Sequence, residues 1–252
     1  MSREQQLARA FVALADTVSP GFDPLALFET LVGDCVQLLD VQASAVMMAD
    51  ARGGLRTMAA SDEQAAFLEL LQLQTGRGPC MQCYRSKTPV HVTDLEQAKD
   101  QWPRLVSAAL DAGFRSMHAL PLRVHEQIIG AVNLFRTSPG NMNADDTAVG
   151  QALADIAALS LLNWTNEAPR DGDIITRVQS AIVAKATVEM AKGMIARYGG
   201  LSIPDASTAL HAYTQRRQAR LSETAQALTE RTLDLAEIIS ETARPQSRRT
   251  TT

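Results

Sequence analysis

The sequence predicts an α+β domain followed by a smaller all-α segment, and three observations lead to this prediction. Between residues 43 and 136, short apolar or alternating runs are bounded by Gly, Pro and Asp, a pattern typical of strands. Around these runs, apolar residues recur every three or four positions, as they do in amphipathic helices. After residue 173 only the helical spacing remains. Strands mixed with helices in this order favour an antiparallel sheet flanked by helices.

Two helices are expected before the first strand. Residues 2–18 carry one apolar stripe at spacings of four and three, formed by Leu7, Phe11, Leu14 and Val18. Ser19-Pro20-Gly21 ends this helix, because Pro and Gly are poor helix residues. A second helix at about 23–40 has Asp23 as its N-cap and Pro24 just inside.

The sheet is expected to contain about five or six strands. Five can be placed, at residues 43–49, 54–60, 89–92, 115–124 and 128–136. The first two form a hairpin around residues 50–53, and the last two flank the polar loop at 125–127. Further helices are expected at about 62–73, 101–112 and 144–164. In the first of these, Phe67, Leu70 and Leu71 are expected to face the core.

Composition favours a cytoplasmic protein with an aliphatic core. Hydrophobic residues make up 46% of the chain but aromatic residues only 4%, so aliphatic side chains must fill the core. No apolar run reaches 18 residues, and the first ten residues lack the hydrophobic region of a signal peptide. We therefore expect no membrane association.

Charge is distributed unevenly along the chain. Residues 1–173 contain 13 basic and 21 acidic residues, for a net charge of −8. Residues 174–252 contain 11 basic and 7 acidic residues, for a net charge of +4. This asymmetry indicates two modules, of which only the second favours polyanions. A solvated helix face is the alternative explanation for the basic residues.

The three cysteines, Cys35, Cys80 and Cys83, are too few for a disulfide scaffold. The spacing Cys80-x-x-Cys83 can bring two thiols together for metal binding or redox cycling. A zinc site would need two more ligands, and His91 is the nearest histidine. We therefore favour structural or incidental cysteines, with redox sensing and metal binding as alternatives, and expect no bound metal or cofactor.

No catalytic constellation is recognisable in the sequence. Gly76-Arg77-Gly78 lacks the spacing and the Lys-Ser/Thr of a phosphate-binding loop. The histidines form no motif with a carboxylate or a nucleophile; they are His91, His118, His125 and His211. Ser/His/Asp and paired-acid arrangements at a recognisable spacing are also absent from the sequence. We expect no catalytic residues and no enzyme activity.

Residues 20–165 resemble a GAF domain. The resemblance is carried by the run GRGPCMQCYRSKTPVHVTDL at 76–95 and by IIGAVNLF at 128–135, in this order and spacing. GAF domains are mostly ligand-binding or dimerising regulatory modules, so the resemblance implies a sensor with an unidentified small-molecule ligand. An N-terminal helix at 1–19 would precede this domain. A linker and helical dimerisation segment at 166–187 would follow it.

Residues 188–228 predict three short helices. The first ends at Gly199-Gly200, and the second begins at Ser202 with Pro204 in its first turn. The third begins near Ser222, and the stretch at 214–220 before it contains three arginines and no acid. Long polar side chains at this junction suit phosphates and unpaired base edges.

Three residues within these helices have two interpretations each. Gly193 costs the first helix roughly 1 kcal/mol relative to Ala, which indicates either close approach by a ligand or backbone, or a helix-packing role. Tyr198 and Tyr213 could stack on an unpaired base, but their stripe positions favour core packing.

The segment at 188–243 resembles the ANTAR domain. The matching positions are Ala191-Lys192-Gly193-Met194, Arg197-Tyr198-Gly199, Asp205-Ala206, Leu210, Arg216, Arg217, Gln218, Arg220, Leu221 and Ala225. ANTAR domains are three-helix RNA-binding modules that act in transcription antitermination. The resemblance implies that this segment binds hairpin loops of nascent transcripts. The implied RNA-binding residues are Lys192, Gly193, Arg197, Arg216, Arg217, Gln218 and Arg220.

The whole chain thus resembles a GAF–ANTAR regulator with a disordered tail at 244–252. Two alternatives stay open: a DNA-binding helix-turn-helix protein, and a redox or metal sensor that uses Cys80 and Cys83. A homodimer is also expected, because the apolar stripes exceed what one sheet of this size covers. These stripes lie at 2–18, 144–164 and 174–182.

Overall fold

The computed structural model describes residues 2–17, 22–163 and 173–242. The expected helix break at 19–21, the linker residues 166–172 and the tail at 244–252 lie outside the described residues. The chain divides into two compact units, Met1–Ile182 and Val183–Thr252. No helix within the described ranges is both long enough and apolar enough to cross a membrane.

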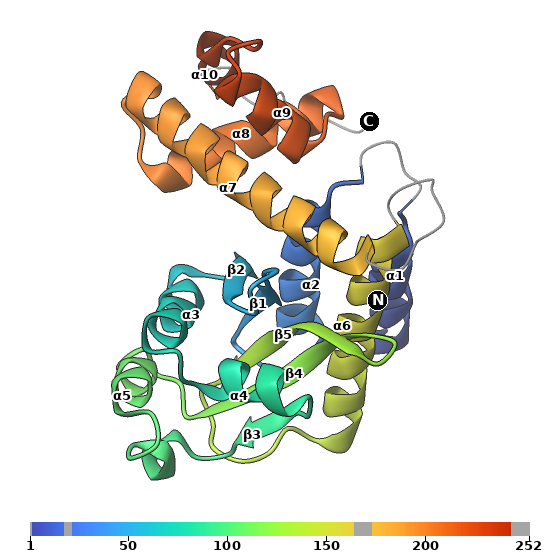
Figure 1. The fold of residues 1–252 in the computed structure, drawn as a ribbon, viewed down its shortest axis with the longest axis vertical. Coiled ribbons are helices and arrows are strands. Elements are labelled where there is room, and N and C mark those ends of the chain that lie inside the picture. The colour runs from blue at the N-terminus through green and yellow to red at the C-terminus, as the bar shows by residue number, and fades with distance from the viewer. Residues whose placement is uncertain (1, 18–21, 164–172, 243–252) are drawn as a thin grey trace. The chain divides into compact units, whose positions relative to one another are not determined.

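The first unit is a five-stranded antiparallel sheet with helices on both faces (Figure 1). The strands are β1 (Ala43–Ala49), β2 (Leu55–Ala60), β3 (Val90–Val92), β4 (Ser116–Val124) and β5 (Gln127–Arg136). Their order across the sheet is β2-β1-β5-β4-β3. The predicted α+β class, the antiparallel sheet and the five placed strands are thereby confirmed.

The α-helices of this unit surround the sheet. They are α1 (Arg3–Ala15), α2 (Pro24–Leu38), α3 (Glu63–Thr75), α4 (Pro79–Ser86), α5 (Pro103–Asp111) and α6 (Ala144–Asn163). A 3-10 turn at Leu95–Ala98 precedes α5. Helices α2 and α6 cover one face, and α1 packs against both. Helices α3 and α4 cover the other face, and α5 packs against α3.

Local sequence signals fix where several helices begin. Asp23 Oδ1 accepts a hydrogen bond of 2.8 Å from the amide of Leu25, and Pro24 occupies the first turn, as predicted. Ser2 forms a capping box at the start of α1. Asp62 Oδ1 accepts from the amide of Ala65 at 2.8 Å and caps α3.

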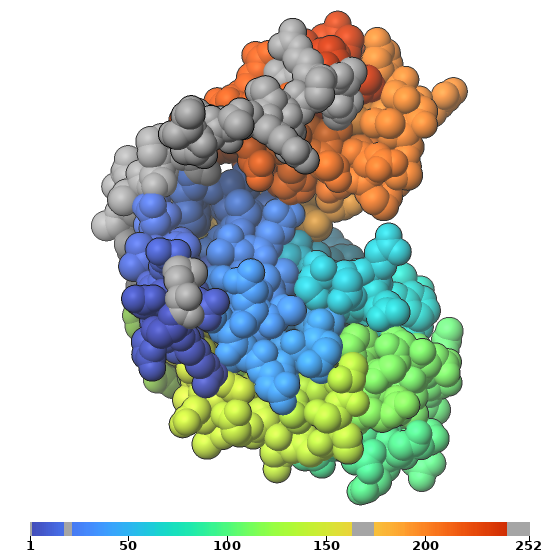
Figure 2. Space-filling model, turned by 180° about the vertical axis from the view of Figure 1, so that it is seen from behind, coloured from blue at the N-terminus to red at the C-terminus, as the bar shows by residue number. Residues whose placement is uncertain are grey.

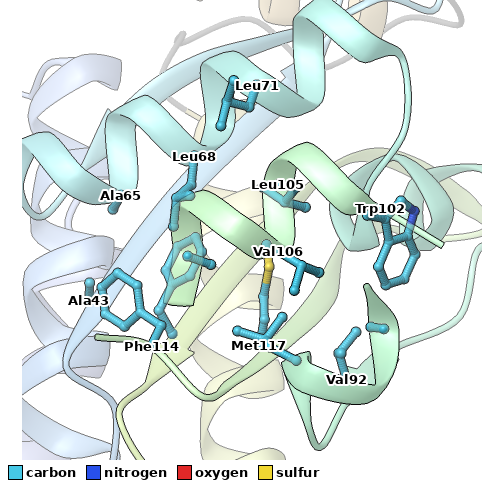
Figure 3. Packing of buried hydrophobic residues seen from close by; sticks show 14 of the residues in the cluster. Ala43, Ala65, Leu68, Leu71, Val92, Trp102, Leu105, Val106, Phe114 and Met117 are labelled. Carbon is cyan, nitrogen blue, oxygen red and sulfur yellow. The ribbon is translucent and has the colours of Figure 1, made fainter. Parts of the chain in front are cut away.

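The core on the α3 and α5 face is largely aliphatic, with a pair of packed aromatic rings. Figure 3 shows Ala65, Leu68 and Leu71 of α3 above the sheet residue Met117. The rings of Phe114 and Phe135 lie 5.2 Å apart between their centroids. Figure 3 also shows Trp102 at the end of this cluster opposite Ala43.

Two details of this region differ from the prediction. Phe67 is 52% exposed and Leu70 is also exposed, so only Leu71 of the three expected core residues is buried. The stripe that faces the sheet is shifted, and it is formed by Ala65, Leu68, Glu69, Leu71 and Gln72. Glu69 and Gln72 are polar, so the spacing of apolar residues did not predict this stripe. Helix α4 was not predicted, because its eight residues are too few to show a clear period.

The second unit is built from the end of α7 (Asp173–Gly199) together with α8 (Ile203–Arg217), α9 (Leu221–Thr229) and α10 (Leu235–Thr242). The expected ends at Gly199-Gly200, Ser202 and Ser222 match these bounds to within one residue. Ser202 accepts from the amide of Asp205 at 3.2 Å and caps α8. The helix expected at 174–182 and the first helix of this unit form one continuous helix, α7. Helix α10 was not predicted.

Gly130 lies where β5 approaches β1 most closely. A Cβ atom at this position would lie 2.1 Å from the carbonyl oxygen of Met47 and 3.0 Å from Cα of Met48. Both neighbours are backbone atoms of the adjacent strand, so the sheet itself would have to shift. Glycine is therefore required here to preserve the sheet.

We expect Gly130→Ala to lower the free energy of unfolding by about 1–3 kcal/mol, because overpacking against backbone cannot be relieved by a side-chain rotation. Gly33→Ala on α2 is the matched control, since a Cβ there contacts nothing within 4 Å. This control should raise stability by roughly 0.5–1 kcal/mol, because alanine favours a helix interior over glycine. Urea denaturation measures both. Equal stability of Gly130→Ala and the wild type would contradict the role of Gly130.

Candidate functional site

A buried polar cluster lies between α3 and the sheet. Asn133 of β5 donates to Glu69 Oε1 at 2.7 Å, and Gln72 Nε2 donates to the two oxygens of Glu69 at 3.3 and 3.2 Å. All three side chains are fully buried. The cluster ties the middle of α3 to a central strand.

The Gly76-Arg77-Gly78 loop completes this arrangement. Gly76 ends α3 in a left-handed conformation, and Gly78 has φ of +149°, where side chains are strained. A Cβ at Gly78 would lie 2.2 Å from Gln72 Oε1. The missing side chain lets Gln72 reach past Gly78 and accept from the amide of Cys80 at 3.0 Å. The two glycines therefore allow a short connection in which the start of α4 packs closely against the end of α3.

Burial raises the pKa of Glu69 to about 8, although the hydrogen bond from Asn133 opposes this shift. The Glu69 carboxyl is thus mostly protonated at neutral pH. Asn133 Oδ1 has no hydrogen-bond partner among the described residues. Apolar periodicity did not reveal this cluster, because two of its residues come from one helix and the third comes from a distant strand.

Cys80 and Cys83 lie on α4 beside this cluster and are fully buried in an apolar environment. Burial raises the pKa of the Cys83 thiol to about 12. Burial, and then the nearby Glu69, raise the pKa of Cys80 well above its ordinary value. Thiolates are the reactive and metal-binding form, so these values disfavour redox or metal chemistry. No three His, Cys, Asp or Glu side chains converge on a metal site within the described part of the chain.

His91 and His118 are brought together by the register of β3 and β4. Their Nδ1 atoms lie 3.0 Å apart. Burial, followed by the proximity of His91 and Arg136, lowers the pKa of His118 to about 4. Both rings belong to the same cross-strand pair, which sequence spacing could not reveal.

Three arginines of the second unit lie at the junction of α8 and α9, as predicted. Arg216 and Arg217 occupy the last turn of α8, Gln218 is its C-cap and Arg220 is the N-cap residue of α9. Arg217 pairs with Glu237 at 3.5 Å, and its guanidinium lies 4.8 Å from the ring centroid of Tyr213. Arg220 pairs with Glu223 at 3.0 Å. Arg216, Arg217 and Gln218 are exposed.

Lys192 differs in environment from these residues. The residue is only 8% exposed, and its Nζ lies 3.1 Å from Glu189 Oε1. Glu189 also pairs with Lys185 at 2.8 Å. Lys192 therefore has a structural partner within α7, and its ammonium group is less accessible to a ligand than the arginines.

The remaining two of the implied RNA-binding residues, Gly193 and Arg197, line an open groove of about 1010 Å³ in the second unit. Met190, Met194, Tyr198, Thr229 and Leu235 complete its lining. A Cβ at Gly193 would contact nothing within 4 Å, so no described residue packs against this glycine. Tyr198 is 59% exposed, which corrects the expectation of core packing, whereas Tyr213 is buried as expected. We call this hollow the Gly193 groove.

The environment of Glu69 predicts a specific pH dependence of stability. Because its pKa is higher in the folded state, the folded state holds a proton that the unfolded chain loses above about pH 4.5. Stability should therefore fall by up to about 1.4 kcal/mol per pH unit as pH rises toward about 8.

We expect Glu69→Gln to remove this slope and to be more stable than the wild type at about pH 8. Urea denaturation across this pH range measures the effect. Glu63→Gln, at an exposed position of the same helix, is the control and should keep the wild-type slope. A slope that persists in Glu69→Gln would show that Glu69 is ionised in the folded protein.

The GAF domain profile matches residues 23–161, which is more than half of the chain. None of the curated proteins compared with the sequence matches it. The chain is also similar to solved structures at low identity, among them the GAF domain of an Acinetobacter phosphoenolpyruvate-protein phosphotransferase. That match has 10% identity, covers 64% of this chain and 93% of the other, and has a TM-score of 0.48.

Two further similar structures have comparable scores. Free methionine-R-sulfoxide reductase from Neisseria meningitidis has 16% identity and a TM-score of 0.46, with coverage of 72% of this chain and 91% of the reductase. The GAF-B domain of DevS from Mycobacterium smegmatis has 18% identity and a TM-score of 0.40, with coverage of 55% and 92%. The profile match across the sheet and its helices decides the assignment: through residues 23–161, this chain belongs to the GAF domain family.

Proposed function

We propose that this chain is a signalling protein in which the GAF domain senses a small molecule and the second unit binds RNA. The observation that carries the RNA-binding proposal is the Gly193 groove. Arg197 on its wall makes no hydrogen bond or ion pair with a described residue, and Tyr198 exposes its ring beside it. An accessible aromatic ring and an unpaired guanidinium suit an unstacked base and its phosphate.

The charge of the second unit supports the same proposal. Within residues 192–220 there are five basic residues and one acidic residue, Asp205. Asp205 caps α8 together with Ser202 and so is occupied locally. Arg216, Arg217 and Gln218 at the end of α8 add exposed donors that suit a polyanion.

We propose transcription antitermination as the outcome of RNA binding. A protein that holds a hairpin loop stabilises that hairpin, and a competing terminator stem then forms less readily. Unpaired loops are the part of RNA whose base edges are open to hydrogen bonding. The arginines cluster at the end of α8 and the start of α9 rather than along the face of one helix, which favours RNA over insertion of a recognition helix into a DNA major groove.

We also propose that the chain forms a homodimer through the face that α1 forms with its neighbours α2 and α6. Val12 of α1 is 70% exposed, and Leu159 of α6 is exposed as well. Helices α1 and α2 lie side by side at the surface (Figure 2), with an apolar groove of about 570 Å³ between them. A closed two-fold association would cover this face.

The RNA-binding proposal predicts different effects on affinity and salt dependence for substitutions that remove a charge and for a substitution that fills the groove. Arg197→Ala and Arg216→Ala should each weaken binding to a hairpin RNA, and each should flatten the log–log salt dependence by about 0.7 for every phosphate that the variant no longer neutralises. Gly193→Leu should weaken binding without changing the salt slope, because it fills the groove and removes no charge. Fluorescence anisotropy across a salt series measures both quantities.

Arg85→Ala on α4 of the GAF domain is the matched control, since Arg85 is an exposed arginine outside the second unit. It should bind RNA as the wild type does, and circular dichroism should show an intact fold for all four variants. Duplex DNA that competes as well as the hairpin would support the DNA-binding alternative. Wild-type affinity in Arg197→Ala and Gly193→Leu would exclude the Gly193 groove as the RNA site.

The dimer proposal predicts that Val12→Glu yields a monomer, because a buried unpaired carboxylate is costly at an apolar interface. Light scattering at micromolar concentration measures the mass. Phe67→Glu on α3 is the control, because Phe67 is similarly exposed but lies on a helix of the opposite face. A monomeric wild type, or a dimer in Val12→Glu, would contradict the proposed interface.

A further inference from the structure

A small cavity of about 230 Å³ lies between the end of α3 and the start of α5 in the GAF domain. Arg77 and Arg104 contribute its charged groups, and Thr75, Gln101 and Trp102 contribute further polar groups. Pro103 and Leu105 contribute apolar surface. We call this cavity the arginine pocket. It is separate from the buried Glu69 cluster and from the Gly193 groove.

The pocket has a net positive charge without a compensating acid. Neither the Arg77 nor the Arg104 guanidinium makes a hydrogen bond or ion pair with a described residue. No carboxylate of the described residues lines the pocket. Arginine is charged at every physiological pH, and both residues are exposed, so their guanidinium groups are accessible to a ligand. Two such groups at one recess favour an anion.

Trp102 adds a hydrogen-bond donor to the arginine pocket. The residue is only 8% exposed, but its indole nitrogen is not among the side-chain atoms that are buried without a partner, so the N–H is accessible at the surface. A ligand in the pocket can therefore accept from it. Figure 3 shows that the Trp102 ring packs at the end of the apolar cluster, so its orientation is fixed by the core.

The start of α5 adds donors beside these side chains. Trp102 is its N-cap residue, and no side-chain hydrogen bond caps the helix. The first-turn amides after Pro103 thus lack an intrahelical acceptor. They point along the helix axis in the direction where an anion is stabilised.

We propose that the arginine pocket binds a small organic anion, a carboxylate or phosphate ester with a compact apolar body. The anionic group pairs with Arg77 and Arg104 and accepts from the Trp102 N–H, and the body lies against Pro103 and Leu105. The volume is below that of pockets for drug-sized ligands, which excludes a whole nucleotide. The inference rests on the proposed sensor function for its biological role, and it names the ligand class of that sensor.

The geometry also links this pocket to the interior of the domain. Arg77 directly precedes Gly78, whose close packing against Gln72 lets the Gln72 side chain accept from the amide of Cys80. A ligand that binds Arg77 therefore also contacts the loop that joins α3 to α4.

The test uses the full chain with Trp164→Phe, which leaves Trp102 as the sole tryptophan. Benzoate and phenyl phosphate are the anionic probes, inorganic phosphate lacks the apolar body, and benzamide lacks the charge. Benzoate or phenyl phosphate should change Trp102 emission saturably, and benzamide should bind at least about tenfold more weakly. Arg77→Gln and Arg104→Gln should each weaken binding by about tenfold or more, because each removes charge-assisted hydrogen bonds.

Arg85→Gln is the matched control and should bind the probes as the parent does. No saturable change with any anion up to millimolar concentration overturns the proposal, as does equal binding of benzamide. Inorganic phosphate that binds as tightly as phenyl phosphate overturns the role of the apolar wall. Hairpin RNA titrations of the same variants keep the two proposals apart, because anion binding without RNA binding refutes only the RNA function.

Discussion

The central strands β1, β5 and β4 are buried on both faces, and this constraint determines the arrangement of the GAF domain. Apolar residues pointing in both directions must be covered by helices on both sides, so α2 and α6 oppose α3 and α4. The strands must also approach closely enough to hydrogen-bond along their length. Gly130 meets this requirement where any Cβ would collide with the backbone of Met47.

Burial on both faces explains why polar side chains inside this domain have unusual properties. Glu69 and His118 lie on the sheet or against it, and burial shifts the pKa of each toward its neutral form. The same burial keeps Cys80 and Cys83 as thiols. A Cys-x-x-Cys spacing is reactive only where a thiolate is stabilised, and this interior does the opposite. The exposed rim, where Arg77 and Arg104 lie, offers better conditions for a charged ligand.

The arginines of the second unit differ in whether they pair with a carboxylate of the same chain. Arg217 and Arg220 pair with Glu237 and Glu223, so an RNA phosphate would have to compete with these carboxylates. Arg197 has no such competitor among the described residues, and it borders an open groove. Exposed ion pairs are weak, so exchange of a carboxylate for a phosphate costs little free energy. A polyanion can therefore reach either kind of arginine, and Arg197 is the one without a competing carboxylate among the described residues.

Local signals in the sequence determined the secondary structure and much of the organisation. Caps at Asp23 and Ser202, glycines at Gly199-Gly200 and the strand hairpins depend on neighbouring residues, so they could be predicted without tertiary contacts. The resemblance to a GAF domain rested on motifs that span the sheet and agrees with the family match. The position of the arginine cluster at the junction of α8 and α9 could likewise be predicted, because the sequence indicates where one helix ends and the next begins.

Only the tertiary structure decided which side chains meet. Phe67 is exposed and Glu69 is buried because packing against the sheet determines which side of α3 faces the core. Asn133, from a strand remote in sequence, donates a hydrogen bond to Glu69. Lys192 is buried and Tyr198 is exposed because burial along α7 depends on which of its positions other parts of the chain cover. His91 meets His118 through strand register, and Arg77 shares a pocket with Arg104 through the packing of α3 and α5. The spacing of apolar residues indicates which side of a helix or strand prefers to be buried. Which side chains are actually buried or paired depends on partners that are remote in the chain.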